Sequence, residues 1–197
     1  MTEAPLRLAV IVGSVRGGRF GLPVAHWFAE EARRFGSFEV DVLDLAELPL
    51  PMAMPELGQE PDAETAAVWE RISQRLHSAD AFALVTPEYN HSYPASLKNV
   101  LDWFRPEWTA KAFGLVSYGG QGGGIRAAEH LRQVISELHS VSVRDAMSFH
   151  NAWDLFDEDA KVKDAGESAA AAKVMLAQLE WWAAILRAGR GSRPYPG

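Results

Sequence analysis

The chain has 197 residues, of which 48% are hydrophobic, 23% charged and 10% aromatic, and its formal net charge is −7. This composition is that of a globular protein and excludes collagen-like and disordered chains, and the length favours a single domain. The absence of cysteine excludes disulfide frameworks, cysteine-ligated zinc, iron–sulfur clusters and thiol nucleophiles. The negative net charge argues against a general nucleic-acid-binding surface, and an anionic ligand would need a local concentration of positive charge.

No targeting or membrane segment is visible in the sequence. Residues 1–5 lack a basic stretch, and the apolar run that follows is interrupted by Arg7. A membrane-spanning helix needs about 20 predominantly apolar residues, and the sequence shows no such run. We therefore expect a cytoplasmic protein that does not act at a membrane.

His26 and Glu30 are four residues apart, but two ligands without a third do not predict a metal site.

Apolar runs and helical spacing alternate along the chain. The first strand, 6–12, is almost continuously apolar, which is typical of a strand covered on both faces. Strands are predicted at 6–12, 38–44, 81–86, 112–117 and 141–149, and helices at 22–35, 63–77, 94–103, 125–138 and 166–188. Because each strand precedes a helix, the pattern predicts a parallel sheet with right-handed crossovers. The glycine- and proline-rich end, 189–197, is expected to be a disordered tail.

These elements predict one α/β domain over residues 1–188, built on a three-layer, doubly wound, five-stranded parallel sheet. A (β/α)8 barrel would need three more strand–helix units and about 250 residues. In doubly wound sheets, ligands bind at the carboxyl ends of the strands, next to the point where the strand order reverses. The loops after the first, third and fourth strands are therefore the candidate site.

The loop from Gly13 to Gly21 has the composition of an anion site. Its four glycines allow backbone N–H groups to approach a ligand closely, and it leads into a helix N-terminus, which favours negative charge. Ser14, Arg16 and Arg19 can donate hydrogen bonds to an anion. The alternative is a solvated turn whose arginines pair with surface carboxylates. A Walker A motif is excluded, because Arg19 and Phe20 stand where its lysine and its Mg²⁺-binding hydroxyl belong.

The loops after the third and fourth strands carry a more specific pattern. Thr86 to Pro94 reads Thr-Pro-Glu-Tyr-Asn-His-Ser-Tyr-Pro, and Leu-Lys-Asn at 97–99 and Asp-Trp at 102–103 follow it. After the fourth strand come Ser-Tyr-Gly-Gly at 117–120 and Gly-Gly-Ile-Arg-Ala at 123–127. Together with the first loop, these motifs resemble those of the NADPH-dependent FMN reductase family, whose fold is flavodoxin-like. The resemblance covers residues 6–140.

The resemblance implies a bound FMN, with no metal, that takes a hydride from NADPH or NADH and passes it to a quinone, azo or nitro compound, to a similar small acceptor or to free flavin. It implies phosphate contacts at Ser14, Arg16, Arg19, Phe20 and Gly21. It implies contacts to the isoalloxazine, largely through backbone groups, at Pro87, Glu88, Tyr89 and Asn90. It also places three residues of the fourth-strand loop beside the flavin, Ser117, Gly119 and Gly120. The cofactor carries the chemistry, so we assign no catalytic acid, base or nucleophile.

Two other functions remain open from the residues. A flavodoxin-type electron carrier would share the fold and cofactor without consuming NAD(P)H, but such carriers typically use a Ser/Thr-rich phosphate loop, which Arg16 and Arg19 disfavour. A flavin-free regulatory or scaffold domain could use the same fold, since fold alone does not establish function. Flavin absorbance and NAD(P)H consumption distinguish the three.

Several features could belong to an oligomer. Five aromatic residues exceed what one small core needs, namely Trp103, Phe104 and Trp108 and, separately, Trp181 and Trp182. Core packing is the simpler explanation for each alone, but aromatic residues are favoured at interfaces, so we expect a homodimer or homotetramer. The proline-rich segment 48–61 could cover a neighbouring subunit's flavin or pack on its own chain. Arg126 could contact a phosphate of the nicotinamide dinucleotide or a partner subunit, or it could be an exposed arginine of the helix. His91 could contact a substrate, or it could be a solvated loop residue.

Overall fold

A computed structural model describes residues 4–56, 58–157, 161–163 and 165–196 of the chain. The strands are β1 (Leu6–Val12), β2 (Phe38–Asp44), β3 (Ala81–Pro87), β4 (Ala112–Tyr118), β5 (Val141–Ser142) and β6 (Met147–Phe149). The helices are α1 (Gly21–Phe35), α2 (Ala63–Ser78), α3 (Ala95–Trp103), α4 (Ile125–Glu137), α5 (Ala152–Leu155) and α6 (Ala165–Ser192). The predicted elements are confirmed to within a few residues, except at the fifth strand and the last helix.

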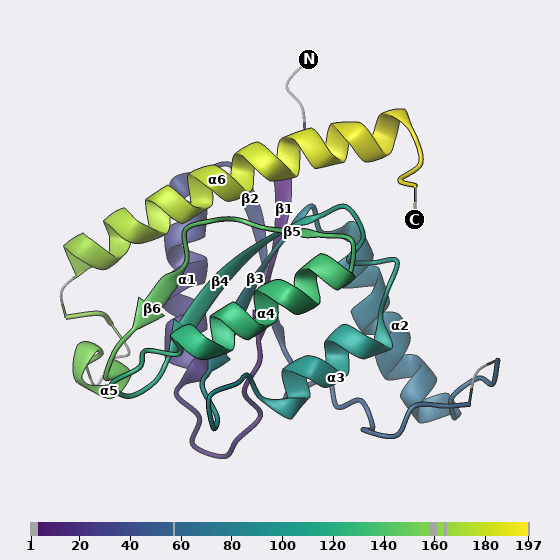
Figure 1. Ribbon diagram of the computed structural model, residues 1–197, viewed down its shortest axis with the longest axis horizontal. Coiled ribbons are helices and arrows are strands. Elements are labelled where there is room, and N and C mark those ends of the chain that lie inside the picture. Colours follow the sequence, from purple (N-terminus) through teal and green to yellow (C-terminus); the bar gives the residue numbers. More distant parts are fainter. Residues whose placement is uncertain (1–3, 57, 158–160, 164, 197) are drawn as a thin grey trace.

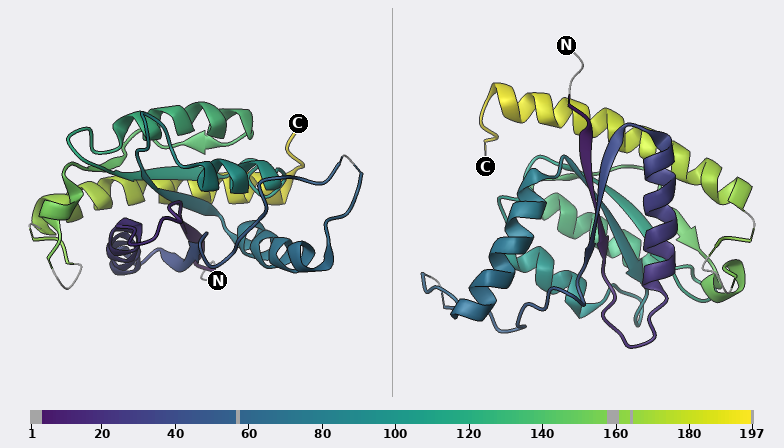
Figure 2. Two further views of the ribbon diagram at one scale, coloured as in Figure 1. Left: turned by 90° about the horizontal axis from the view of Figure 1, so that it is seen from below. Right: turned by 180° about the vertical axis from the view of Figure 1, so that it is seen from behind.

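All strand pairs in the sheet are parallel, in the order β2-β1-β3-β4-β5. Helices cover both faces, so the predicted three-layer, doubly wound, flavodoxin-like fold is confirmed (Figures 1 and 2). The chain crosses from β1 to β2 on one side and then returns to β3 on the other side of β1. The strand order therefore reverses between β1 and β3, and a ligand site is expected at their carboxyl ends.

Alternate residues of the central strands supply two separate cores. Leu8, Val10 and Val12 face the layer of α1 and α6, whereas Ala9 and Ile11 face the layer of α2, α3 and α4. The five residues from Leu8 to Val12 are at most 1% exposed. This explains why the strand has no polar alternation, because both of its faces are covered.

The fifth strand is interrupted. β5 and β6 both pair with β4, and the Val143 N–H between them still donates to Phe113 O of β4 (2.9 Å), but residues 144–146 leave the ladder. Arg132 on α4 donates to the carbonyl oxygens of Val143 (2.7 Å) and Arg144 (3.0 Å), and the Asp145 N–H donates to Gln178 of α6 (3.1 Å). Side chains therefore satisfy the backbone groups that a continuous strand would have paired.

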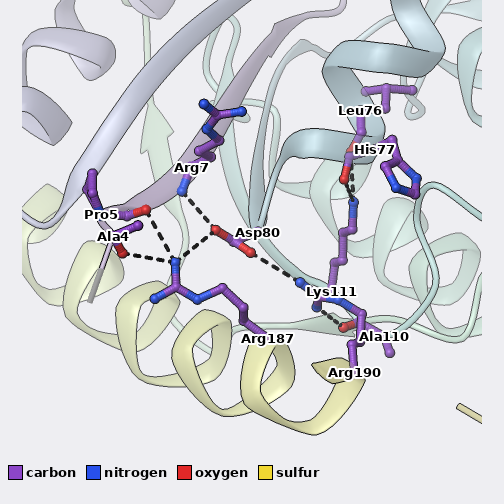
Figure 3. Close-up of polar contacts among 10 residues, drawn as sticks. All are labelled: Ala4, Pro5, Arg7, Leu76, His77, Asp80, Ala110, Lys111, Arg187 and Arg190. Atoms are coloured by element: carbon purple, nitrogen blue, oxygen red, sulfur yellow. Dashed lines mark hydrogen bonds and ion pairs between the residues drawn. The ribbon is translucent and has the colours of Figure 1, made fainter. Parts of the chain in front are cut away.

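The last helix is longer than predicted. α6 ends at Ser192, four residues beyond the expected end of the domain at Ala188, so the expectation of a disordered tail is wrong for the helical part of 189–197. Arg190 holds this end by donating to Ala110 O (2.6 Å) and to Asp80 (3.2 Å), and Asp80 also accepts from Arg187 (3.4 Å; Figure 3). Gly197 lies outside the described residues.

By length and composition alone, α6 is also apolar enough to cross a membrane. The segment Gly166–Ser192 has a mean hydropathy of 1.2 over its best window, of which 28% is buried inside the protein. No uninterrupted apolar run marks this helix in the sequence, because Lys173, Glu180 and Arg187 interrupt it. One such helix is weak evidence for a membrane span, since core helices of soluble domains pass the same test.

Candidate functional site

The loops after β1, β3 and β4 come together at one edge of the sheet. Pro87 at the end of β3 is in register with Tyr118 at the end of β4, and Val12 at the end of β1 is in register with Val85. The Gly13 N–H donates to Val85 O (2.9 Å), which joins the start of the first loop to β3. The three stretches that the sequence singled out are therefore neighbours in space.

The first loop has the free donors that an anion requires. Within the described part of the chain, no hydrogen bond to protein is made by the backbone N–H groups from Ser14 to Gly18. Gly18 has a φ of 62°, a conformation that glycine adopts without strain. The loop ends at the N-terminus of α1, whose first turn holds no acidic residue. Backbone donors and the helix dipole thus favour a bound anion here.

Arg19 has a different role from the one predicted. Its guanidinium donates to both carboxylate oxygens of Asp44 (2.8 and 2.5 Å) and to the Ser14 carbonyl (2.9 Å). The two side chains are only 13% and 8% exposed. Arg19 therefore ties the first loop to the end of β2, and Asp44 offsets its charge, so little of its charge remains for a ligand.

The other two polar side chains of the loop differ sharply in burial. Arg16 is exposed and has no ion-pair or hydrogen-bond partner among the described residues. Ser14 is 1% exposed, and its Oγ lies 3.0 Å from the Tyr89 hydroxyl of the second loop. Arg16 is thus the cationic side chain of this loop that is available to an anion, whereas Ser14 links the first loop to the second.

Phe20 and Gly21 shape the site from below. The Phe20 ring packs on Tyr118 and Phe156, with centroid distances of 6.3 and 5.2 Å, so its partly buried side chain packs against the core. A Cβ on Gly21 would lie 2.7 Å from the Tyr118 hydroxyl, so the present position of the Tyr118 side chain depends on glycine there. Burial raises the pKa of Tyr118, which is therefore a neutral hydroxyl beneath the loop.

The second loop is a tight hairpin. Tyr89 and Ser92 exchange two backbone hydrogen bonds (2.8 and 3.1 Å), and the two residues between them, Asn90 and His91, have φ values of 50° and 67°. Positive φ at both central positions is the geometry of a type I′ turn. Tyr89 is 38% exposed and offers an aromatic surface at the sheet edge. The Asn90 N–H has no protein partner in the described part of the chain.

Glu88 and Arg126 join the second loop to the third. The Glu88 carboxylate accepts from the Arg126 Nε (2.5 Å) and backbone N–H (3.2 Å). Both residues line a hollow of about 440 Å³ together with the glycine loop 119–124. The Glu88 side chain is 9% exposed and that of Arg126 49%. This carboxylate is thus engaged with Arg126, consistent with the expectation that the loop would act on a ligand largely through backbone groups.

The third loop is held by a buried hydroxyl. Ser117 is 1% exposed and donates to Gly123 O (2.9 Å), so it organises the loop from beneath and does not face the hollow. Gly119 and Gly120 line the hollow, and their contact with the flavin stays a prediction. Gly124 has a φ of 83°, and a Cβ on it would lie 2.7 Å from the Ser117 Cβ, so this close packing requires glycine.

The segment 48–61 packs on its own chain at one end. The Asn99 side chain donates to Leu50 O (3.0 Å), and the Trp103 indole donates to Pro51 O (3.0 Å), which fixes this part of the segment on α3. Met52 and Met54 remain 68% and 50% exposed. A hollow of about 410 Å³ separates this segment from Val15 of the first loop.

Residues 6–154 match the family model described as NADPH-dependent FMN reductase. The chain belongs to this family. It is 39% identical over 127 residues to a NAD(P)H-dependent FMN reductase of Schizosaccharomyces pombe, a match covering 62% of each chain. It is 36% identical over 143 residues to a 2-hydroxy-1,4-benzoquinone reductase of a Burkholderia species, covering 69% of this chain and 73% of that one.

A solved structure shows the same fold over nearly the whole chain. The NAD(P)H:(acceptor) oxidoreductase FerB of Paracoccus denitrificans superposes with a TM-score of 0.72 at 24% identity, covering 91% of this chain and 98% of FerB. At this identity, the likeness supports the fold and nothing finer.

The residues present in this family member fit FMN. A phosphate dianion matches the N-terminus of α1, and it matches the N–H groups of the first loop and Arg16, which have no partners among the described residues. A planar ring matches the exposed Tyr89 and the side-chain-free surface of Gly119 and Gly120. The fit thus rests mainly on backbone donors and on Arg16, because Arg19, the other arginine that the sequence suggested, is paired with Asp44.

Sequence reasoning missed Asp44 and Tyr118 as parts of the site. Asp44 ends β2, so the rule that ligands bind at the carboxyl ends of strands could have drawn attention to it. Its pairing with Arg19 links residues 25 positions apart and leaves no local signal. Tyr118 was part of the quoted motif, but only the packing of α1 against β4 shows its hydroxyl beneath Gly21.

Proposed function

We propose that this protein is a NAD(P)H-dependent FMN and quinone reductase. The observation that carries the proposal is that three features lie together where the strand order reverses. They are the first loop, whose backbone N–H groups from Ser14 to Gly18 have no partner among the described residues, the Tyr89–Ser92 hairpin and the glycine-lined hollow. The chain belongs to the NADPH-dependent FMN reductase family. When bound, FMN supplies the redox chemistry, accepting a hydride from NAD(P)H and delivering reducing equivalents to an acceptor.

The chain's own residues bind and orient the cofactor. We assign the phosphate to the N–H groups of the first loop and to Arg16, with Arg19 and Asp44 holding the loop in shape. We assign the flavin ring to the Tyr89–Ser92 hairpin, where the Asn90 N–H is a free donor, and to Gly119 and Gly120. No proton transfer by a side chain is needed for the hydride step.

The acceptor class is supported by the relatives. A Burkholderia relative is named for reduction of a hydroxybenzoquinone, and a Pseudomonas putida relative, 30% identical over 165 residues, is named a quinone reductase. Azo and nitro compounds and free flavin are further candidates. The hollow of about 440 Å³ is of a size that admits a small planar molecule.

The experiment is a steady-state assay of the purified protein loaded with FMN. We expect oxidation of NADPH or NADH that increases when a benzoquinone is added. A flavin-loaded protein that consumes neither nucleotide would be an electron carrier, and a protein that takes up no FMN would contradict the proposal altogether.

Assembly and location are further parts of the proposal. A homodimer or homotetramer is supported by the exposed Trp181 (58%) and Met52 (68%), since apolar side chains this exposed are favoured at interfaces. The measurement is the mass in solution. The cytoplasmic location expected from the sequence stays a prediction, which cell fractionation tests.

A further inference from the structure

One charged pair lies in the hollow beside the loops assigned to the flavin. The hollow of about 440 Å³ is lined by Glu88 of the second loop, by Arg126 at the start of α4 and by the glycine loop 119–124. The Arg126 Nε donates to one Glu88 carboxylate oxygen (2.5 Å), and the Arg126 backbone N–H donates to the other (3.2 Å). Among the described residues that line the hollow, no other side chain is ionisable.

The two members of this pair differ in burial. The Glu88 side chain is 9% exposed, whereas the Arg126 side chain is 49% exposed. The carboxylate is therefore covered, and the charge that the hollow presents to solvent is positive. In the pair of Arg19 and Asp44, by contrast, both side chains are buried, so neither charge is available to a ligand.

The Arg126 guanidinium keeps unused donors. It contacts Glu88 through Nε and Nη2, and its Nη1 has no hydrogen-bond partner among the described residues. A Cβ on Gly122 would lie 2.6 Å from Nη2, so the guanidinium packs on the glycine loop, and its present position depends on glycine at residue 122. Contacts with Glu88 and Gly122 thus hold the cation at the wall of the hollow before a ligand binds.

Backbone groups favour the same kind of ligand. The N–H groups of Gly120, Gln121 and Gly122 make no hydrogen bond to protein within the described part of the chain. The hollow also lies at the N-terminus of α4, whose first turn holds no acidic residue. Unbonded N–H groups and the helix dipole stabilise negative charge. Together with the half-exposed guanidinium, they make the hollow a site for an anion.

From this arrangement we infer that Arg126 makes the enzyme prefer acceptors that are planar anions, such as ionised hydroxyquinones and quinone carboxylates. The inference rests on the proposed reductase function, in which a flat acceptor stacks on a flat cofactor. Arg126 is then a specificity-determining residue, whose guanidinium pairs with the charged oxygen of the acceptor. Glu88 is a positioning residue that holds this guanidinium and offsets part of its charge. The FMN phosphate, assigned to the first loop, does not need this second cation.

A phosphate group of the nicotinamide dinucleotide matches the hollow less well. Small-molecule sites span about 300–1,000 Å³, and this hollow lies near the lower end of that range. A dinucleotide consists of two ring systems joined by a diphosphate, whereas the hollow offers room for one ring system and presents one guanidinium. A ring that carries a single charged oxygen fits both the volume and the charge. The first test separates the two ligands.

The first test uses 1,4-naphthoquinone and 2-hydroxy-1,4-naphthoquinone, whose hydroxyl is ionised at neutral pH. The ratio of kcat/KM for the hydroxylated quinone to that for the parent quinone is measured with the FMN-loaded wild type and with Arg126→Gln. Differences in reduction potential between the quinones cancel when the ratios are compared. We expect the ratio to fall about tenfold to 100-fold in Arg126→Gln, because a charge-assisted hydrogen bond is lost.

The matched control is Arg33→Gln, which removes another half-exposed, ion-paired arginine, on α1, and is expected to keep the wild-type ratio. Arg126→Lys keeps the charge and is expected to lower the ratio less than Arg126→Gln does. An unchanged ratio in Arg126→Gln, with a raised KM for NADPH or NADH, would assign Arg126 to the dinucleotide and overturn the inference.

The second test moves the charge in the opposite direction. In Glu88→Gln the amide oxygen can still accept from the Arg126 Nε, but the negative charge is gone, so the guanidinium attracts an anion more strongly. We expect the ratio to rise about threefold to tenfold. A ratio that moves in the same direction in Arg126→Gln and Glu88→Gln, or in neither variant, overturns the inference.

Binding without turnover gives a readout that does not depend on reductase activity. 2-Naphthoate and its neutral amide share one ring system and are not reduced, so their binding is followed by titration of the absorbance of the bound FMN. We expect the wild type to bind the naphthoate at least about tenfold more tightly than the amide, and Arg126→Gln to bind both alike. A protein with this preference that oxidises neither nucleotide would fail as a reductase and keep the anion site. An active reductase that binds both compounds equally would lose this inference alone.

Fold and assembly are followed in the same variants. Circular dichroism and FMN uptake show whether each variant folds, and Arg126→Met gives a second route to the result of Arg126→Gln. The mass in solution is measured by sedimentation velocity. A changed mass in Arg126→Gln, together with an unchanged ratio for the two quinones, would show that Arg126 serves a subunit contact and would overturn the inference.

Discussion

Arg19 and Asp44 form a bidentate ion pair that joins the first loop, Gly13 to Gly21, to the end of β2. The guanidinium donates to the two carboxylate oxygens at 2.8 and 2.5 Å, and the same carboxylate accepts from the Ala46 N–H at 3.0 Å. Arg19 also donates to Ser14 O, so its side chain links the backbone at the start of the first loop to Asp44. The pair holds the first loop in one conformation before a ligand binds, so less conformational entropy of this loop is lost on binding.

Asp44→Asn is therefore expected to weaken FMN binding about tenfold and to destabilise the fold by about 2 kcal/mol, because it leaves a largely buried guanidinium without its counter-charge. Quenching of flavin fluorescence gives the binding constant, and urea unfolding gives the stability. Asp41→Asn is the matched control. Asp41 lies on the same strand as Asp44 and makes a similar bidentate pair with Arg75 of α2, but that pair is exposed and is expected to contribute under about 1 kcal/mol.

Arg16→Gln tests the assignment of the free cation. We expect a loss of about tenfold in FMN affinity and no change in riboflavin affinity, because riboflavin lacks the phosphate. Stability should stay within about 0.5 kcal/mol, since the side chain is exposed. Arg33→Gln, at the far end of α1, should leave both affinities unchanged. Equal losses for FMN and riboflavin would show that Arg16 does not contact the phosphate.

Gly124→Ala tests the packing of the third loop. The backbone there has a φ of 83°, and a Cβ would lie 2.7 Å from the Ser117 Cβ and 2.8 Å from the Tyr118 N. We expect a loss of about 2 kcal/mol or more in the free energy of unfolding. Gly17→Ala, in the first loop, meets nothing within 4 Å and should be nearly neutral. Similar stabilities for the two variants would contradict this description of the loop.

Lys111, just before β4, is expected to make the free energy of unfolding depend on pH. Its Nζ donates to Leu76 O (2.7 Å) and His77 O (3.0 Å) at the end of α2 (Figure 3), and burial lowers its pKa to about 7, with the charge of Arg190 acting in the same direction. Asp80 and Glu107 oppose this shift.

Since the unfolded chain holds this proton up to a pKa of about 10.4, the native state binds fewer protons between pH 7 and 10. The free energy of unfolding of the wild type should therefore rise with pH relative to Lys111→Met, by up to about 1.4 kcal/mol per pH unit. Urea unfolding at pH 7, 8 and 9 measures the difference. Lys98→Met removes an exposed lysine and should show no such slope. A flat difference for Lys111→Met would mean that this lysine stays charged in the fold.

The sheet could be predicted from sequence because its strands are short apolar runs with both faces buried. The edge strand β2 could be predicted as well, although it carries more polar residues, whereas the break between β5 and β6 depends on Arg132 and Gln178, which belong to helices elsewhere in the chain. The residue pattern of 141–149 does not indicate contacts with side chains that belong to other helices. The end of α6 was misplaced because its glycines suggest a stop, but Arg190 anchors the last turn on Asp80 and Ala110.

The positions of the three loops could be predicted. Which of their side chains are available to a ligand and which hold the loops in place could not. Arg16 and Arg19 look equivalent in the sequence, and only the position of Asp44 makes one a structural brace and leaves the other free. Ser117 likewise reads as a possible ligand contact, yet its hydroxyl is bonded to Gly123 O below the surface. In both cases a partner distant in sequence decides what the side chain can do.

The most direct test of the central claim is anaerobic stopped-flow mixing of the FMN-loaded protein with NADPH and, separately, with NADH. The account predicts that at least one nucleotide bleaches the flavin absorbance at a rate that saturates with nucleotide concentration, and that a benzoquinone added afterwards restores the absorbance. A protein that binds FMN but whose flavin stays oxidised with both nucleotides would contradict the reductase assignment.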